Sequence, residues 1–131
     1  MPARQFAWHH GDVQLRCVIV DDDTIFLDVA RALLEREGMT VAGLAGNCAE
    51  AVERARALHP DVMLIDIRLS EESGFDTARQ LAADGQAAAL IMISTYREAD
   101  YADLIAESPA AGFVAKADLS AAAIRRVLGA D

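Results

Sequence analysis

The sequence predicts a single α/β domain, in which a doubly wound sheet of five parallel strands carries helices on both faces. The chain has 131 residues, the length of one ordinary domain. Short apolar runs alternate along it with segments whose apolar residues recur at helical spacing. The runs lack the polar alternation of half-exposed strands, which is typical of parallel strands covered on both sides.

The first unit shows the pattern. Residues 15–20 are a valine-rich apolar run, which predicts a strand. Residues 24–37 predict a helix that stops at Gly38. The apolar face expected for this helix consists of Ile25, Val29, Leu33 and Leu34.

The other four units repeat this alternation of a strand and a helix. A proline follows the second and fourth helices and a glycine follows the third, and both residue types end helices. The predicted elements are residues 39–44, 49–58, 62–65, 75–83, 88–93, 99–107, 111–115 and 119–128. Right-handed crossovers then place helices on both faces, and such sheets bind ligands beyond the carboxyl ends of their strands. Residues 1–13 are predicted to be an irregular extension of a domain over residues 14–131.

Composition narrows the classes of function. Hydrophobic residues make up 53% and charged residues 25%, which excludes disorder. The formal net charge of −9 disfavours direct binding to nucleic acid or to an anionic membrane. We find no membrane span and no signal-peptide core. Cys17 and Cys48 lack metal-site spacing and indicate a reducing compartment, so we expect a cytoplasmic protein.

Polar side chains stand directly after four of the five predicted strands. In chain order they are Asp21, Asp22, Asp23, Asp66, Ser94, Thr95 and Lys116. Because parallel strands end at one edge of a sheet, we expect these side chains to meet in one pocket. An acidic triplet by itself is more typical of a solvated helix start. The joint placement, with the only lysine of the sequence among the seven, indicates a site.

The residue types at this edge predict phosphoryl chemistry. Carboxylates held close together repel each other, and a bound divalent cation removes that conflict. Oxygen ligands at a partly hydrated site suit Mg²⁺. A hydroxyl and a compact ammonium suit the oxygens of a phosphoryl group. The pattern predicts phosphoryl transfer to a carboxylate, with Mg²⁺ and Lys116 neutralising developing charge.

Four segments carry a resemblance to a known family. They are VIVDDD (18–23), MLIDIRLSEESGF (63–75), IMIST (91–95) and GFVAKADL (112–119). In their order and spacing the chain resembles the receiver domain of bacterial two-component response regulators over about residues 15–129. The resemblance implies a flavodoxin-like fold with strand order 2-1-3-4-5. It also implies a phosphoacceptor signalling domain and not an enzyme, phosphorylated on one aspartate from a histidine kinase.

The resemblance assigns the reactive residues. Asp66 resembles the phosphoacceptor, Asp22 the direct metal ligand and Asp21 a partner ligand through water. Arg68 would offer its backbone carbonyl to the metal, which is Mg²⁺ or Mn²⁺. Lys116 resembles the lysine that binds the phosphate.

The resemblance also assigns a switch. Ser94 resembles the switch hydroxyl, and Phe113 the aromatic residue that turns inward on activation, with a plain core role as its alternative. Gly74 matches the glycine that closes the loop after the acceptor. We expect side chains near the acceptor to shield the phosphoryl group from water and slow its loss. These are Arg68, Thr95 and Tyr96.

Three residues depart from the family pattern. Ala117 follows Lys116 where a cis proline is usual. A cis bond before a non-proline residue costs about 3 kcal/mol, so we expect a trans bond or a different loop path. Ser70 replaces a usual proline, and Thr95 replaces a small residue, which predicts a narrower pocket mouth.

The expected partners follow from the resemblance. The phosphodonor would be a sensor histidine kinase or a phosphotransfer protein. A downstream protein would bind the surface of residues 99–107, 111–115 and 119–128, where charges of both signs also allow a homodimer. The chain ends just past the last predicted helix, which favours a stand-alone receiver. The alternatives are the receiver of a longer DNA-binding regulator, a pseudo-receiver that takes no phosphate, and an aspartyl-phosphate hydrolase. The hydrolase would need an acidic residue at the position that Arg68 occupies.

Overall fold

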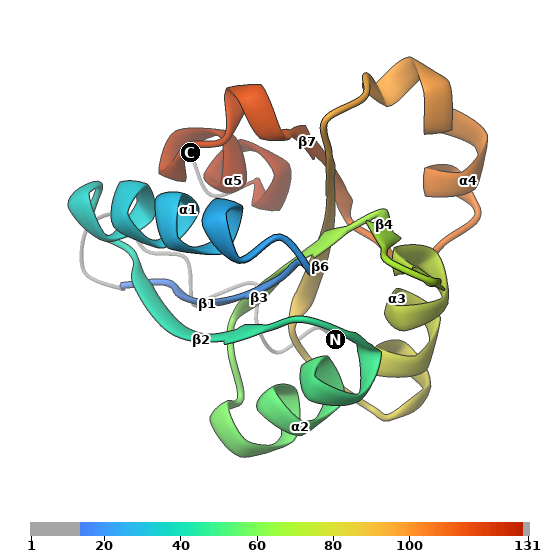
Figure 1. Ribbon diagram of the computed structural model, residues 1–131, viewed down its shortest axis with the longest axis horizontal. Coiled ribbons are helices and arrows are strands. Elements are labelled where there is room, and N and C mark those ends of the chain that lie inside the picture. The colour runs from blue at the N-terminus through green and yellow to red at the C-terminus, as the bar shows by residue number, and fades with distance from the viewer. Residues whose placement is uncertain (1–13, 130–131) are drawn as a thin grey trace.

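The computed structural model describes residues 14–129, so the predicted extension at residues 1–13 lies outside the described residues. Within this range a five-stranded sheet, parallel throughout, has the order β2-β1-β3-β6-β7 (Figure 1). Its strands are β1 (Arg16–Val20), β2 (Thr40–Ala45), β3 (Val62–Asp66), β6 (Ala89–Ser94) and β7 (Gly112–Ala115). Counted among these five strands alone, the order is 2-1-3-4-5, so the predicted fold class is confirmed.

Helices cover both faces of the sheet, as predicted. They are α1 (Thr24–Arg36), α2 (Cys48–Leu58), α3 (Gly74–Ala83), α4 (Ala102–Ala106) and α5 (Ala121–Leu128). α1 and α5 pack on one face, and α2, α3 and α4 pack on the other (Figure 1). Each helix in the described range is too short or too polar to cross a membrane.

Alternate strand residues enter different halves of the core. Ile19 and Leu64 pack toward α1 and α5, whereas Val20 and Ile65 pack toward α2 and α3, and all four are fully buried. Burial on both faces explains why the strands are continuous apolar runs. Polar groups are therefore confined to the strand ends.

Half of the predicted apolar face of α1 is confirmed, since Leu34 is buried and Leu33 packs against the core, but Ile25 and Val29 are wrong. The structure buries Leu27, Ala30 and Leu34, while Ile25 is 75% and Val29 is 61% exposed. This helix has two overlapping series of apolar residues at helical spacing, and either series could face the sheet. In the structure the series of Leu27, Ala30 and Leu34 faces the core.

The region predicted as one helix at residues 99–107 is divided. A 3-10 helix, η2 (Glu98–Tyr101), precedes the short α4. Tyr101, at their junction, has φ −127° and ψ 11°, which is not helical. Neither segment has a side-chain cap, and α4 buries only Ile105. Helical spacing overestimated this helix because tertiary packing supplies most helix stability, and α4 has little of it.

Two details near strand ends were not predicted. α5 begins at Ala121 and not at residue 119, because the Ser120 hydroxyl accepts a hydrogen bond from the Ala123 N–H (2.9 Å) and caps the helix. After β3, the chain forms a small antiparallel hairpin of β4 (Arg68–Leu69) and β5 (Glu72–Ser73). Ser70, which turns the hairpin, has a left-handed φ of 56°.

Candidate functional site

The acidic triplet after β1 divides between two roles. Asp23 is the N-cap of α1, and its Oδ1 accepts hydrogen bonds from the N–H groups of Ile25 (3.0 Å) and Phe26 (3.2 Å). Asp21 is fully buried, and its Oδ1 accepts a hydrogen bond from the Asp23 N–H (2.9 Å). The helix start therefore uses Asp23, and Asp21 and Asp22 remain for the sheet edge.

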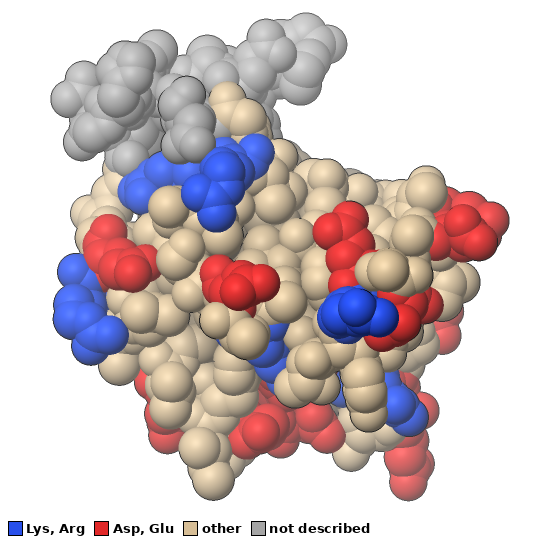
Figure 2. Space-filling model, turned by 90° about the horizontal axis from the view of Figure 1, so that it is seen from above, with Lys and Arg blue, Asp and Glu red and all other residues tan. Residues whose placement is uncertain are grey.

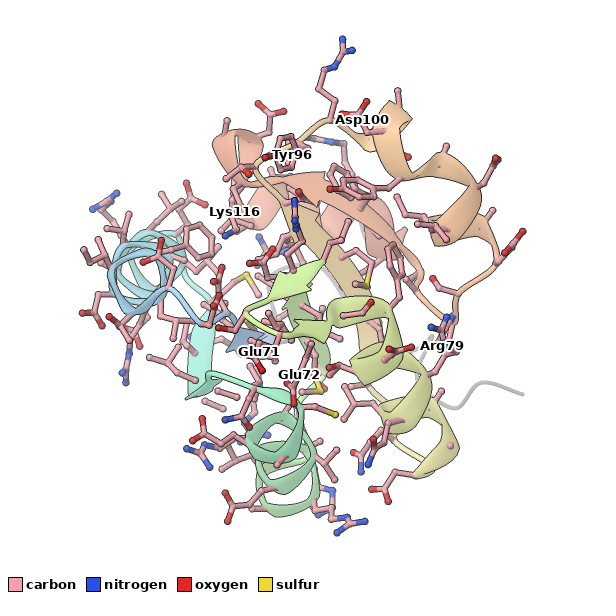
Figure 3. All side chains as sticks on the ribbon, turned by 45° about the vertical axis from the view of Figure 1, so that its right-hand side comes forward. Glu71, Glu72, Arg79, Tyr96, Asp100 and Lys116 are labelled. Atoms are coloured by element: carbon pink, nitrogen blue, oxygen red, sulfur yellow. The ribbon has the colours of Figure 1, made fainter. Side chains whose placement is uncertain are left out.

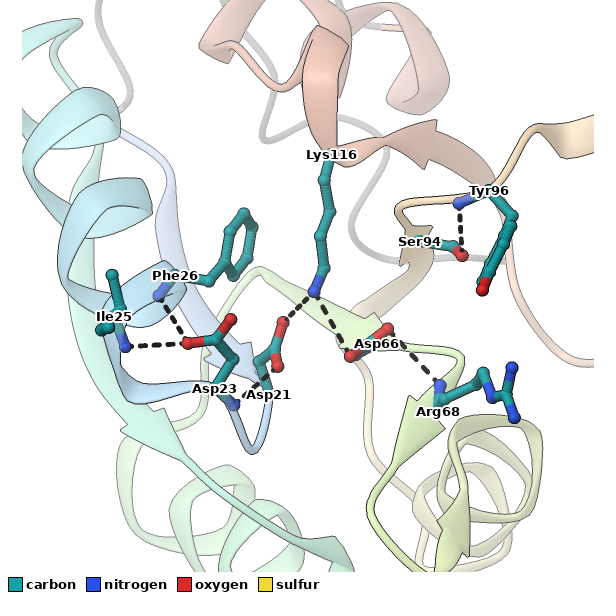
Figure 4. Close-up of polar contacts among 9 residues, drawn as sticks. All are labelled: Asp21, Asp23, Ile25, Phe26, Asp66, Arg68, Ser94, Tyr96 and Lys116. Atoms are coloured by element: carbon teal, nitrogen blue, oxygen red, sulfur yellow. Dashed lines mark hydrogen bonds and ion pairs between the residues drawn. The ribbon is translucent and has the colours of Figure 1, made fainter.

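Lys116 meets the ends of β1 and β3 from across this edge (Figure 4). It begins the 3-10 helix η3 (Lys116–Asp118), directly after β7. Its Nζ lies 2.6 Å from Asp21 Oδ2 and 3.3 Å from Asp66 Oδ2. Asp66 is the last residue of β3 and is 8% exposed. The structure thus brings together the lysine and the aspartates that the sequence singled out.

The carboxylates at this edge have the chemistry of a divalent-cation site. Asp21, Asp22 and Asp66 each present one oxygen, and these oxygens lie within 4.8 Å of one another. Among the described residues, the buried Asp21 Oδ2 has no well-aligned hydrogen-bond donor, although the Lys116 ammonium lies beside it. Three carboxylates against one ammonium leave an excess of negative charge, which a hard cation with oxygen ligands would neutralise. The residues present therefore fit such an ion.

Burial and crowding shift the ionisation of this cluster. Burial, followed by repulsion from Asp21, raises the pKa of Asp66 to about 6, although Lys116 and the Arg68 N–H favour the charged carboxylate. For Lys116, burial disfavours the ammonium, but the contacts with Asp21 and Asp66 outweigh burial and raise the pKa of Lys116. The ammonium therefore stays charged while it faces Asp66, whose carboxyl group is costly to ionise.

Gly74 lets α3 begin against the end of β3. Its N–H donates a hydrogen bond to the Ile67 carbonyl (2.7 Å). A Cβ at this position would overlap the Asp66 carbonyl oxygen and lie 2.9 Å from the Ile67 Cα. Glycine is thus required for α3 to approach the strand end that carries Asp66.

The end of β6 adds a hydroxyl to the same edge. Ser94 is 2% exposed, and its Oγ accepts a hydrogen bond from the Tyr96 N–H (3.0 Å; Figure 4). Thr95 and Tyr96 are exposed, and the Tyr96 ring meets the Tyr101 ring edge-on, with 6.5 Å between centroids. The end of β6 therefore presents one buried hydroxyl, and the loop after it begins with two exposed side chains.

The β4–β5 hairpin contributes backbone to the site. The Arg68 N–H donates a long hydrogen bond to Asp66 Oδ1 (3.4 Å), while its guanidinium points away from Asp66 (Figure 4). Glu72 Oε1 accepts a hydrogen bond from the Cys48 N–H (2.9 Å), which fastens the hairpin to the start of α2 (Figure 3). The role expected of the Arg68 carbonyl stays a prediction.

Phe113 lies in β7 behind the site. It is half-buried and packs against the core on the side of α2 and α3. It also lines a cavity of about 340 Å³ on the surface, together with Arg97 and Arg126. The peptide bond between Lys116 and Ala117 is trans, which confirms one of the two expected outcomes.

Comparison with known proteins agrees with this geometry. The family model of the response regulator receiver domain matches residues 17–127. The chain belongs to this family. This receiver domain is similar to the transcriptional regulatory protein LnrK of Bacillus subtilis, at 30% identity over 108 residues, which cover 82% of this chain and 49% of LnrK. It is similar also to the uncharacterized transcriptional regulatory protein YvfU of the same species, at 32% identity over 103 residues, or 78% of this chain and 52% of YvfU.

A solved structure of a response regulator has the same fold. The crystal structure of a two-component response regulator of the LuxR family from Aurantimonas sp. SI85-9A1 matches this receiver domain with a TM-score of 0.79. The identity is 27%, and the match covers 88% of this chain and 86% of that chain. The chain spans about half the length of the curated relatives that it matches.

Sequence reasoning missed three aromatic contacts of this receiver domain. The Lys116 Nζ lies over the Phe26 ring, 4.3 Å from its centroid. Tyr101 contacts both Tyr96 and Phe75, with 6.5 Å between centroids in each pair. Apolar spacing shows that a helix has a buried face, but it does not show which ring at a helix end reaches a polar site.

Proposed function

We propose that this receiver domain accepts a phosphoryl group on Asp66 from a phosphohistidine of a sensor histidine kinase or a phosphotransfer protein. The observation that carries the proposal is the 3.3 Å between Asp66 Oδ2 and the Nζ of the only lysine in the sequence. Two further carboxylates, Asp21 and Asp22, lie at the same edge. Receiver domains are signalling domains and not enzymes in the usual sense, and the family implies interaction with such phosphodonors.

In the transfer, an Asp66 oxygen attacks phosphorus, a P–O bond forms as the P–N bond breaks, and the histidine leaves with the bonding electrons. The Lys116 ammonium then binds one phosphoryl oxygen as a compact positive charge. The Ser94 hydroxyl donates to another. Its oxygen already accepts from the Tyr96 N–H, so its own proton is free to be donated.

The cation site belongs to the same proposal. We propose that Asp21, Asp22 and Asp66, with the Arg68 carbonyl, hold Mg²⁺ or Mn²⁺. When bound, the ion supplies neutralisation of the charge that gathers on the phosphoryl oxygens. The excess of negative charge at the buried Asp21 and Asp66 supports this assignment.

The output of the domain is proposed to be a change of surface. Movement of Ser94 toward the phosphoryl group would free space for Phe113, and the surface of α4, β7 and α5 would change with it. The cavity of about 340 Å³ beside Phe113 lies on this surface. Acidic side chains gather at the right-hand side of Figure 2, the side on which Figure 1 places α4. A downstream protein or a second copy of the chain would bind here.

A second candidate concerns the wider protein. The two curated relatives described above are named transcriptional regulatory proteins, and this chain spans about half of each. We therefore retain the proposal that the domain controls a DNA-binding part of a longer regulator, beside the proposal of a stand-alone receiver.

Cys17 and Cys48 are both free thiols, which supports a cytoplasmic location.

The test is incubation of the chain with Mg²⁺ and acetyl phosphate, followed by intact mass measurement. We expect an increase of one phosphoryl group that is lost in Asp66→Asn and retained in Asp76→Asn, an exposed aspartate on α3. No adduct, or an adduct that persists in Asp66→Asn, would favour a pseudo-receiver.

A further inference from the structure

The Lys116 ammonium has an aromatic contact as well as two carboxylate contacts. Its Nζ lies 4.3 Å from the centroid of the Phe26 ring on α1, well inside the range of a cation–π interaction. Asp21 Oδ2 and Asp66 Oδ2 lie 2.6 Å and 3.3 Å from the same atom. The lysine side chain is only 13% exposed, which strengthens an interaction with a ring.

Phe26 is fixed by its backbone at the start of α1 and by partial burial of its ring. Its backbone N–H donates to the N-cap carboxylate of Asp23 (3.2 Å), which fixes the first turn of α1. Its side chain is half-buried and packs against the core between the sheet, α1 and α5. Figure 4 shows the ring on the α1 side of the Lys116 side chain, with Asp66 on the opposite side. The Phe26 ring therefore has a defined position beside the longer and more flexible Lys116 side chain.

A ring suits this position better than a third carboxylate would. During phosphoryl transfer the lysine must turn from the Asp66 oxygen to an oxygen of the phosphoryl group. Another carboxylate would hold the ammonium and compete with that oxygen. An aromatic face attracts the cation but offers no lone pair, so it restricts the four-carbon stem while leaving the donors free.

We propose that Phe26 is a positioning residue that keeps the Lys116 ammonium at the transfer site before and after Asp66 is phosphorylated. The expected effect of Phe26 on phosphoryl transfer rests on the proposed function, but the contact between Phe26 and Lys116 can be measured without phosphorylation. The predicted family roles of Lys116 and Asp66 do not require an aromatic residue at this place.

The first measurement uses the single lysine of the sequence. The full chain, labelled with ¹³C and ¹⁵N in lysine only, gives one set of lysine side-chain signals. We expect the Hε protons of Lys116 to be shifted upfield by the ring in the wild type and in Phe26→Tyr. In Phe26→Leu they move toward the position of free lysine. Leu33→Ala is the matched control, because Leu33 is half-buried on the same helix and core.

The second measurement is the rate of phosphorylation by saturating acetyl phosphate with Mg²⁺. Phe26→Leu is expected to slow this rate about three- to thirtyfold, the range that corresponds to a partly desolvated cation–π contact. Phe26→Tyr, which keeps the ring, retains the rate, and so does Leu33→Ala. A general loss of stability would instead slow Phe26→Leu and Leu33→Ala alike.

Two results would overturn the proposal. One is an Hε position that is the same in the wild type and in Phe26→Leu. The other is an equal loss of rate in Phe26→Leu, Phe26→Tyr and Leu33→Ala. A wild type that takes no phosphoryl group would reject the proposed function, and the positioning role with it. The lysine spectrum would then show separately whether the ring contact exists.

Discussion

Single side chains at the sheet edge are held in an arrangement that stability alone would not favour. Asp21 is fully buried, Asp66 is 8% exposed, and one ammonium serves both. Burial of carboxylates without enough opposite charge costs free energy. The site therefore carries a charge conflict that removal of one carboxylate should relieve.

We expect Asp66→Asn to stabilise the protein above about pH 6 in the absence of divalent cations. The pKa of Asp66 rises from 3.8 to about 6 on folding, so its protonated form is the one that folding favours. The wild type therefore loses stability as the pH rises through this window, by about 3 kcal/mol for a shift of this size. Urea unfolding at pH 4 and pH 7.5 measures the difference, which should be small at pH 4.

The matched control is Asp84→Asn, because folding shifts the pKa of Asp84 in the opposite direction to that of Asp66. Side-chain hydrogen bonds from Arg56 and Gln86 lower the pKa of the half-buried Asp84 carboxyl, so folding favours its charged form. This variant should gain no stability at pH 7.5. A stabilisation by Asp66→Asn that is equal at both pH values would contradict the charge argument.

The lifetime of the phosphoryl group is a second property of single residues. Tyr96 is 52% exposed beside Ser94, and we expect its ring to slow the approach of water to a phosphoryl group on Asp66. Tyr96→Ala should shorten the lifetime by up to about tenfold. Arg68→Ala should shorten it less, because the guanidinium points away from Asp66 (Figure 4).

Loss of the mass adduct over time, after removal of the donor, measures this lifetime. Thr95→Ala tests the third expected residue and should act in the same direction. A lifetime unchanged in all three variants would reject shielding by these side chains.

At the scale of elements, the end of β3 and the start of α3 depend on one glycine. We expect Gly74→Ala to destabilise the protein by about 3 kcal/mol, because the new Cβ would overlap the Asp66 carbonyl and force the two backbones apart. Gly46→Ala is the control, since its Cβ would meet only ordinary contacts at 3.5 Å and 4.0 Å. Thermal unfolding compares the two, and equal losses would mean that the close approach is not required.

At the scale of the whole molecule, the ends of β1 and β3, neighbours in the sheet, must lie together for the proposed cation site to form. We expect millimolar Mg²⁺ to raise the free energy of unfolding, by about 2.7 kcal/mol when the ion is at a hundred times its dissociation constant. Asp22→Asn should weaken this gain while leaving the fold intact, because Asp22 is exposed. Urea unfolding with and without Mg²⁺ measures the gain. The proposed cation site would be wrong if both proteins gained equally.

Much of the molecule follows from the sequence. Apolar runs such as Val62–Asp66, which ends in its one aspartate, predict buried parallel strands, because a strand covered on both faces tolerates no polar side chain until it ends. The same rule places Asp21, Asp66 and Lys116 at one edge, and the structure brings them together there. The resemblance to receiver domains, carried by these segments, is confirmed by the family match.

Other features were decided only by tertiary packing. Local spacing allowed two apolar faces for α1, and contact with the sheet selected Leu27 over Val29. The sequence does not distinguish the three consecutive aspartates, yet in the structure Asp23 caps α1 and Asp21 pairs with Lys116 at the sheet edge. The Phe26 ring reaches Lys116 only because α1 and η3 lie side by side in the fold. The sequence by itself determined the strands and the reactive groups at their ends, because a strand covered on both faces must be apolar along its own length and can carry polar residues only where it ends. Only the assembled sheet and helices determined which neighbours those groups meet.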